Sequence, residues 1–429
     1  MLGFDHTISR RDFFATATLA TTAITLSARS YARVLGANER IGIGFIGAGG
    51  MGTNHLNACK ELKENDNLQF FGVADCWKTR AEKGAALLET EAATDYRTLL
   101  DKKEIDYVTI ATPEHRHAQM VLDALAAGKA VYCEKPLTHT IEEAQSVAKK
   151  QKETGLALQV GVQSMSDACY SSAAKAIANG VIGQVVQAQI EYVRRYDKQG
   201  LFREPGLDSN MSKPDDLDWG AWLGNAPTVP WNPHHYFEWR CYSAYSGCIA
   251  TDLFIHRLSR IIKACNLECP RRVVGMGGIW QWNDGRDLPD NFEMICEYPR
   301  GMTVYVLGTQ SNRVDFDHLI RGYRGTLYFT DDGWIAKDKD GKELASDHAP
   351  PKEDIHLHHT NLHNHLRKGE PLNCPIELAL AGLVAVCMAN ESWRTSQMIG
   401  WDQNNQRMAP AHTLELGHLP ESLTPAGKG

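Results

Sequence analysis

Ile41 to Ile46 reads IGIGFI and runs directly into Gly47-Ala48-Gly49-Gly50-Met51-Gly52. The apolar run is typical of a strand in a parallel sheet that is covered on both faces. The motif after it is G-x-G-x-x-G, placed to open a helix. Its glycines permit a tight turn, close approach of a pyrophosphate and close packing of helix on strand, while the helix N-terminus attracts phosphate. The stretch therefore predicts a dinucleotide site, with a purely structural glycine turn as the alternative.

An acidic residue ends the next expected strand, Gln69 to Ala74. This residue is Asp75, 23 positions past Gly52. A carboxylate there can accept hydrogen bonds from a ribose 2′-hydroxyl and would repel a 2′-phosphate. The spacing therefore favours NAD, with NADP possible if Lys78 or Arg80 holds a phosphate. Arg80 could instead stack on the adenine or face solvent.

The order of elements predicts two domains. Strands and helices alternate through the strand Ala157 to Gly161, as in the crossover units of a parallel sheet. Beyond it, strands such as Asn291 to Glu297 and Thr303 to Leu307 follow one another without helices, as in a mostly antiparallel sheet. We expect an α/β protein with an N-terminal doubly wound Rossmann domain (33–161) and a C-terminal α+β domain for substrate binding and oligomerisation (162–429). A last helix, about 376–395, should pack back.

Charge and cysteine usage exclude several classes of partner and site. The net charge of -7 and the pI near 6.2 give no electrostatic reason to expect nucleic acid or an anionic membrane surface. A neutral, hydroxyl-rich small molecule fits better. The 11 cysteines are scattered without a C-x-x-C pair, which argues against a zinc ribbon or a dense disulfide framework.

The N-terminus carries an export motif. Ser9-Arg10-Arg11-Asp12-Phe13-Phe14 precedes a mildly apolar stretch that ends near Leu26 and is followed by small residues. We interpret residues 1–32 as a twin-arginine signal peptide, which places the mature protein in the periplasm or elsewhere outside the cytoplasm. The alternative is a mobile N-terminal arm. The stretch is too short and too weakly apolar for stable membrane insertion. Twin-arginine export carries folded proteins, often with a cofactor already inserted, so a tightly bound cofactor is expected.

Two further segments should border the nicotinamide, because doubly wound sheets bind ligands at the carboxyl ends of their strands. Thr112-Pro113-Glu114-His115-Arg116-His117 follows one such strand, and Glu134-Lys135-Pro136 follows the next. Either could also be an ordinary turn with incidental charges. The predicted cofactor-binding residues are Gly47, Gly49, Gly50, Met51, Gly52, Asp75, Arg80, Thr112, Pro113, His117, Glu134 and Lys135.

With these motifs in place, the chain resembles the glucose-fructose oxidoreductase, inositol dehydrogenase and rhizopine-catabolism (MocA) family. The resemblance rests on the glycine motif, on ATPEHRHAQMVLDALAAGKAVYCEKPLTHTIEEA and on SGCIATDLFIHRLSRI. It implies a second domain with a large open sheet, a commonly cis Lys-Pro bond in the E-K-P motif, a sugar or polyol substrate, and association into a homo-oligomer through the open sheet.

The family pattern places the catalytic groups on the E-K-P lysine and on a D-x-x-x-H motif, which here are Lys135, Asp252 and His256. Residues about four apart lie on one face of a helix, so the carboxylate and the imidazole can converge. Oxidation of an alcohol needs a base for the hydroxyl proton, and histidine titrates in a useful range. We assign His256 as general acid/base, Asp252 as its orienter or a ligand of a substrate hydroxyl, and Lys135 as the cation that polarises the reacting oxygen.

The chain departs from the family pattern near this motif. Ser246-Gly247-Cys248 stands where relatives have a glycine run, and Phe254 fills the interior of D-x-x-x-H, where glycine is common. The arginine often seen after Gln163 is missing. We therefore expect a reshaped pocket and transfer no relative's substrate.

Aromatic residues are dense between positions 219 and 245, and their faces suit the apolar faces of pyranose rings. The alternative is a long loop packed down by its own aromatics. The predicted substrate-binding residues are Gln163, Arg194, Trp222, His235, Arg240 and Tyr245. The histidine-rich run His356 to His365 has one pair at helical spacing but no acidic partner, so we expect no metal site.

These observations leave more than one function open. The first is an exported NAD(P)-dependent oxidoreductase that acts on a sugar or polyol hydroxyl carbon. The second is a redox-neutral glycosidase or epimerase, in which tightly held NAD is reduced and reoxidised in place; export favours it because little free NAD exists outside the cytoplasm. The third is a non-catalytic sugar-binding protein, which the intact Lys135, Asp252 and His256 argue against.

Overall fold

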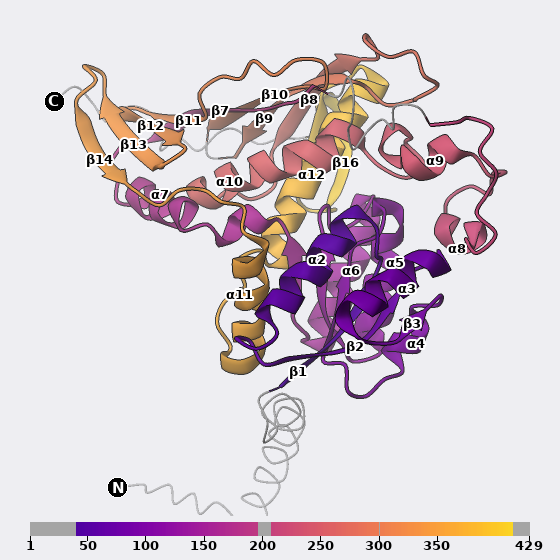
Figure 1. The fold of residues 1–429 in the computed structure, drawn as a ribbon. Helices are drawn as coiled ribbons and strands as arrows, with labels where there is room; N and C mark the ends of the chain where they lie inside the picture. The colour runs from indigo at the N-terminus through magenta and orange to yellow at the C-terminus, as the bar shows by residue number, and fades with distance from the viewer. Residues whose placement is uncertain (1–39, 196–206, 300, 415–429) are drawn as a thin grey trace, which may run out of the picture.

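The chain folds into two domains in the computed structural model, which describes residues 40–195, 207–299 and 301–414 (Figure 1). The proposed signal peptide, residues 1–32, lies outside the described residues. The first domain is built on a 6-stranded sheet and the second on a 10-stranded sheet.

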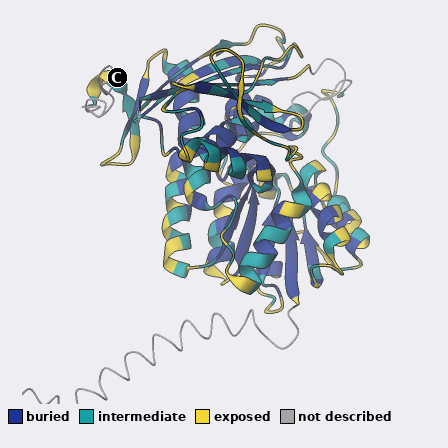
Figure 2. Cartoon of the chain, turned by 90° about the vertical axis from the view of Figure 1, so that its left-hand side faces the viewer, coloured by how far each residue is buried: buried dark blue, intermediate teal, exposed yellow. Residues whose placement is uncertain are grey.

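The first domain is a doubly wound parallel sheet with the strand order β3-β2-β1-β4-β5-β6. Alternate side chains of β1 point to opposite faces, so Ile43 and Phe45 join the core under α2 and α3, whereas Ile46 joins the core under α5 and α6. Figure 2 shows the buried strands between partly exposed helices. The elements are β1 (Ile41–Ile46), α2 (Gly50–Leu62), β2 (Leu68–Ala74), α3 (Lys78–Leu88), β3 (Ala92–Ala93), α4 (Arg97–Leu100), β4 (Tyr107–Ile110), α5 (Glu114–Ala126), β5 (Ala130–Glu134), α6 (Ile141–Thr154) and β6 (Leu158–Gly161).

Local sequence signals explain the ends of these helices. Thr140 and Glu143 form a reciprocal capping box at the start of α6, and Gly155 ends that helix in the left-handed conformation, with φ of 66°. Gly47 has φ of 95°, and a Cβ there would collide with the carbonyl of Ala111. The glycine turn therefore cannot carry a side chain at this point.

The second domain contains the sheet β14-β13-β12-β11-β7-β10-β9-β8-β15-β16, in which β7 and β10 pair in parallel and the other pairs are antiparallel. Its strands are β7 (Val185–Val193), β8 (Arg272–Gly278), β9 (Asn291–Tyr298), β10 (Met302–Thr309), β11 (Leu319–Gly322), β12 (Gly325–Thr330), β13 (Gly333–Asp338), β14 (Glu343–Asp347), β15 (Ile399–Asp402) and β16 (Arg407–Pro410). Its helices include α7 (Ala168–Ala178), α8 (Trp219–Leu223), α9 (Pro233–Phe237), a π-helix (Ile249–Phe254), α10 (Ile255–Cys265), α11 (Ile355–Lys368) and α12 (Ile376–Thr395). The expected fold class is confirmed.

Two late helices tie the second domain to the first. Helix α11 lies against α2, and its Leu362 joins the core of the Rossmann domain (Figure 1). Helix α12 is long and apolar enough to span a membrane by length and composition, but most of it is buried against α10, β8 and α6. These contacts join the two domains.

Candidate active site

A cavity of about 1360 Å³ lies between the domains. One end is bordered by the glycine turn and Asp75, and the other by Lys135, Asp252 and His256. Of the predicted site residues, it is lined by Gly47, Gly49, Gly50, Met51, Asp75, Arg80, Thr112, Pro113, Glu134, Lys135, Gln163, Trp222, Arg240, Asp252 and His256. A single cavity therefore contains both a nucleotide end and a reaction end.

The nucleotide end is built by the β1–α2 turn and the end of β2. The Asp75 carboxylate accepts hydrogen bonds from the backbone N–H groups of Ala48 (2.9 Å) and Trp77 (2.8 Å), which hold it beside the turn. Gly50 faces open space, with nothing within 4 Å of a Cβ built on it. A partly exposed carboxylate beside an open helix N-terminus fits a ribose and a pyrophosphate.

Arg80 is held by aromatic rings. Its guanidinium carbon lies 4.8 Å from the ring centre of Trp77 and 5.2 Å from that of Tyr236. A Cβ built on Gly49 would come within 3.3 Å of the Arg80 side chain. The guanidinium therefore sits over the glycine turn.

Residues Asp215 to Asp218 of the second domain, here called the strap, cross this end of the cavity. The Lys78 N–H donates to the Asp216 carbonyl (3.1 Å), and the Asp218 N–H donates to the Cys76 carbonyl (2.9 Å). The Asp216 side chain accepts from Thr79 Oγ1 (2.6 Å) and from the Trp77 indole (2.9 Å). The strap thus closes over the β2–α3 loop.

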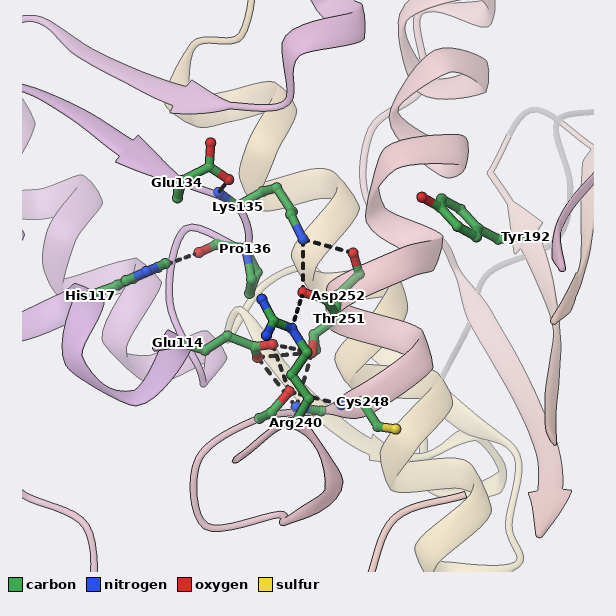
Figure 3. A network of polar contacts seen from close by, with 12 residues as sticks. Glu114, His117, Glu134, Lys135, Pro136, Tyr192, Arg240, Cys248, Thr251 and Asp252 are labelled. Atoms are coloured by element: carbon green, nitrogen blue, oxygen red, sulfur yellow. Dashed lines mark hydrogen bonds and ion pairs between the residues drawn. The ribbon is translucent and has the colours of Figure 1, made fainter. Parts of the chain in front are cut away.

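The reaction end is centred on a buried ion cluster. Lys135 Nζ donates to Asp252 Oδ1 (2.8 Å) and to the Asp252 carbonyl (2.9 Å), and Arg240 Nε donates to the same Oδ1 (2.9 Å) (Figure 3). Burial opposes ionisation of Asp252, but the two cations outweigh it and hold the pKa of that carboxyl well below its usual value. The Lys135–Pro136 bond is cis, as the resemblance implies.

Two polar atoms in this cluster have no hydrogen-bond partner. They are Asp252 Oδ2 and His256 Nδ1, and both are buried. Burial, with Lys135 adding to it, lowers the pKa of His256 to about 3, so the imidazole is neutral. Unsatisfied buried groups cost free energy unless a ligand or water completes them. This end of the cavity is therefore suited to a ligand that bears hydroxyl groups.

A π-helical turn aims Asp252 at Lys135. The turn starts after Cys248, whose φ is 55°, and is anchored by the buried Glu114 carboxylate. Glu114 accepts hydrogen bonds from Ser246 Oγ (2.7 Å) and Thr251 Oγ1 (2.8 Å) (Figure 3). Burial raises the pKa of Glu114. Single π-turns occur often at functional sites because they re-aim one side chain.

Phe254 does not enter the cavity. It is fully buried and packs against Phe292 at 5.9 Å between ring centres, on the sheet side of the helix. The residue in the interior of D-x-x-x-H therefore fills the core of the second domain. Gln163, in contrast, reaches the cavity and donates to Glu134 Oε1 (2.7 Å).

Five predicted site residues do not line this cavity. Gly52 packs its helix against the carbonyl of Gly47. His117 is buried between the carbonyls of Pro136 (2.7 Å) and Thr112 (2.8 Å), so it joins two loops that border the cavity. His235 and Tyr245 bond to each other (3.0 Å) within the aromatic loop. Arg194 lies over Tyr192 and borders a separate cavity of about 460 Å³.

The aromatic segment is packed largely against itself. Trp219 stacks on Trp222 at 4.7 Å and contacts Trp231 at 5.2 Å, and Tyr245 lies 4.9 Å from Trp222. One face of Trp222 is thus covered. Trp239, which belongs to the aromatic stretch noted in the sequence but not to the predicted substrate-binding residues, borders the cavity with Arg240 stacked on it at 4.1 Å.

The histidine run forms helix α11. His358, His359 and His363 are fully buried, and among the described residues no group of three or more His, Cys, Asp or Glu is placed to hold a metal ion. His363 bonds to Asp66 (2.6 Å) and to Tyr107 (2.9 Å). The run therefore packs α11 against the first domain.

With this geometry established, comparison with known proteins shows what the first domain resembles. Residues 41–162 match the model of the Gfo/Idh/MocA oxidoreductase family, described as an NAD-binding Rossmann fold. The first domain is thus similar in sequence to members of this family. The chain is 38% identical to scyllo-inositol 2-dehydrogenase (NAD(+)) of Bacillus subtilis over 115 residues, which are 27% of this chain and 34% of that protein. It is 30% identical to levoglucosan dehydrogenase of Pseudarthrobacter phenanthrenivorans over 167 residues, 36% of this chain and 42% of that protein.

The fold of both domains is shared with solved structures. A levoglucosan dehydrogenase in complex with NADH and levoglucosan gives a TM-score of 0.65 at 18% identity, covering 84% of this chain and 99% of that one. The WlbA dehydrogenase of Bordetella pertussis, in complex with NADH and UDP-GlcNAcA, gives a TM-score of 0.63 at 17% identity, covering 85% and 99%. These likenesses establish a shared fold, while the matched sequence spans less than half of the two curated relatives named above.

Proposed function

We propose that the protein is an exported NAD-dependent oxidoreductase that transfers a hydride between the nicotinamide and a hydroxyl-bearing carbon of a sugar or polyol. The observation that carries the proposal is one cavity with a dinucleotide turn at one end and the Lys135–Asp252–His256 cluster at the other. The relatives named as inositol and levoglucosan dehydrogenases support the substrate class.

The cofactor fits the residues that are present. Gly47, Gly49 and Gly50 would hold its pyrophosphate, Asp75 its adenosine ribose, and Thr112 and Glu134 its nicotinamide half. Bound NAD supplies the hydride acceptor, which no side chain of the protein can provide. The carboxylates of Asp75 and Asp216 lie at the adenosine end, and their charge disfavours the 2′-phosphate of NADP.

Side chains of the protein carry out the proton transfer and stabilise the reacting oxygen. His256 is neutral and offers an unpartnered Nδ1, so it can take the hydroxyl proton as the hydride leaves, although its lowered pKa makes it a weaker base than the ordinary histidine expected from the sequence. Lys135 is fixed by Asp252 and places a cation where the reacting oxygen gains charge. Arg240 shares the Asp252 carboxylate, which limits the motion of both cations.

The strap favours a second candidate, a redox-neutral glycosidase or epimerase that reduces and reoxidises the same NAD. Asp216 bonds to Trp77 and Thr79 across the adenosine end, and we expect this closure to slow exchange of a bound nucleotide. A retained cofactor must be regenerated in place. A non-catalytic sugar-binding protein would have no use for this closure or for the ionised Asp252.

Export and assembly are parts of the same proposal. The twin-arginine motif at Arg10 and Arg11 supports export. The outer face of the second sheet carries exposed Met276 and Ile295, 68% and 48% exposed, on the neighbouring strands β8 and β9. Such a face supports association with a second copy of the chain. Light scattering of the purified protein would show a monomer if this part is wrong.

The deciding experiment is to denature the purified, exported protein and measure released nucleotides by mass spectrometry and absorbance. Near-stoichiometric NAD or NADH supports a retained cofactor and the redox-neutral route. If no nucleotide is released but added NAD binds saturably, the result supports a dehydrogenase with an exchangeable cofactor. If no nucleotide is released and added NAD does not bind, the proposed function is rejected.

A further inference from the structure

A buried chain of hydrogen bonds leads from the cavity into the interface between the domains. Glu134 Oε1 bonds to His55 Nε2 (2.9 Å), and His55 Nδ1 bonds to His359 Nε2 (2.8 Å). The three residues come from β5, α2 and α11, and their exposed fractions are 4%, 0% and 0%. None of them takes part in the proton transfer proposed above.

With both imidazoles neutral, this hydrogen-bond chain has one self-consistent arrangement of protons. If Glu134 is ionised, His55 must donate Nε2–H to it, and Nδ1 of His55 must then accept from Nε2–H of His359. Nδ1 of His359 is left as an acceptor, and this buried atom has no partner. The His359 ring is stacked on Tyr132 at 4.3 Å, which holds its orientation. The arrangement carries a single negative charge, and that charge is on Glu134.

Glu134 has the contacts of a stable carboxylate. Gln163 donates a second hydrogen bond to Oε1 (2.7 Å), and the Lys135 N–H donates to Oε2 (3.2 Å). Burial opposes ionisation, but the hydrogen bond from His55 and the nearby cation of Lys135 outweigh that effect and lower the pKa of Glu134. The carboxylate is therefore charged at neutral pH.

The negative charge of Glu134 is compensated by fewer cationic side chains than the negative charge of Asp252. Asp252 bonds directly to the side chains of Lys135 and Arg240, whereas the side chains that bond to Glu134 are an imidazole and an amide. Glu134 ends β5 and borders the cavity beyond the glycine turn. A dinucleotide with its adenosine at the Asp75 end must extend its nicotinamide toward Glu134.

We propose that Glu134, positioned by His55 and His359, makes the site bind oxidised NAD more tightly than NADH. The inference rests on the proposed function. The oxidised nicotinamide ring is cationic and the reduced ring is neutral, so a fixed carboxylate in a low-dielectric cavity favours only the oxidised form. An enzyme that keeps its cofactor would then rest in the oxidised state, ready to accept a hydride.

The test measures cofactor preference and not turnover. Glu134→Gln keeps the shape and the acceptor oxygen but removes the charge. We expect the affinity for NAD relative to NADH to fall about tenfold, which is about 1.4 kcal/mol. If the cofactor does not exchange, the reduction potential of the bound pair should rise by about 30 mV, since tenfold corresponds to about 30 mV for two electrons.

A second variant and a control keep the outcome clear. His55→Leu removes the donor and should shift the preference in the same direction, whereas His363→Gln should leave it unchanged. His363 is equally buried on α11, but it bonds to Asp66 and Tyr107 and takes no part in the hydrogen bonds that link Glu134, His55 and His359. Equal loss of NAD and NADH affinity in Glu134→Gln would overturn the inference. Failure of the unaltered protein to bind either nucleotide would instead reject the proposed function.

Discussion

Replacement of Asp252 by asparagine should separate the stability of the ion cluster from its chemistry. In the native protein Oδ1 of Asp252 faces Lys135 Nζ at 2.8 Å and Arg240 Nε at 2.9 Å, and the carboxylate is 2% exposed. Asparagine keeps the shape and one acceptor oxygen but leaves two cations that are 11% and 18% exposed without a counter-charge. Lys135 and Asp252 also join the two domains, so the change weakens their interface.

The expected loss can be worked from these contacts. Removing one partner of a buried ion pair costs about 3–5 kcal/mol. The amide oxygen and the Asp252 backbone carbonyl still accept hydrogen bonds, each worth about 1 kcal/mol, so the lower end applies. A loss of about 3 kcal/mol lowers Tm by about 6–12 °C for domains of this size.

The pH dependence has a defined sign. The pKa of Asp252 is lower in the folded state than in the unfolded state, so its stabilisation is present above about pH 4 and is lost as the pH falls through the folded value. The difference in Tm between native protein and Asp252→Asn should therefore shrink below about pH 4.

Thermal unfolding across pH, together with turnover on a candidate sugar, checks the argument. A matched control is Glu297→Gln, which also removes a carboxylate held by two cationic side chains, here Arg271 and Arg272, but on β9 away from the cavity. The control should keep its turnover, whereas Asp252→Asn should lose turnover about a hundredfold or more. A native Tm and native turnover in Asp252→Asn would refute the assignment of this carboxylate.

Further outcomes can be measured on the same protein. His256→Asn should lower turnover about a hundredfold or more while leaving NAD affinity, measured by calorimetry, intact; unchanged turnover would remove it as the base. Asp75→Ala should weaken NAD by about 1.5–3 kcal/mol in the same assay, and no loss would exclude it from the ribose site. Asp216→Ala should release bound cofactor about tenfold faster in stopped-flow exchange, because it opens the strap. The free energy of unfolding should fall as the pH drops from about 6.5 to 4, by roughly 1 kcal/mol per pH unit for each buried histidine such as His115 or His358. Burial lowers the pKa of these two histidines to about 3 and 4, so unfolding takes up protons in this pH range. A free energy of unfolding that does not change with pH would contradict this expectation.

The local signals in the sequence were the most reliable. The glycine motif between a buried strand and a helix determines its own backbone geometry, and the alternation of strands and helices predicted the parallel sheet. The pairing of Lys135 with Asp252 could be anticipated only from the family resemblance, because 117 positions separate them. Spacing within one helix cannot reveal a partner on another domain.

Long-range packing accounts for what the sequence did not reveal. Nothing local distinguishes Asp216, since its partners Trp77 and Thr79 belong to another domain. His235 and Tyr245 have the composition of sugar ligands, but each satisfies the other within the loop. The β13 to β16 strands are short, and their apolar alternation is weak.

The strap also sets an order of events during synthesis. The Rossmann domain leaves the ribosome first, and domains generally fold as units from the N-terminus. Its nucleotide turn, around Gly47 to Gly50, is therefore complete while residues 215–218 are still to be made. A nucleotide can enter an open groove at that stage, and the later arrival of Asp216 on Thr79 closes the groove behind it. If the cofactor is retained as proposed, the nucleotide pool around the ribosome at the moment of translation determines which cofactor each molecule carries.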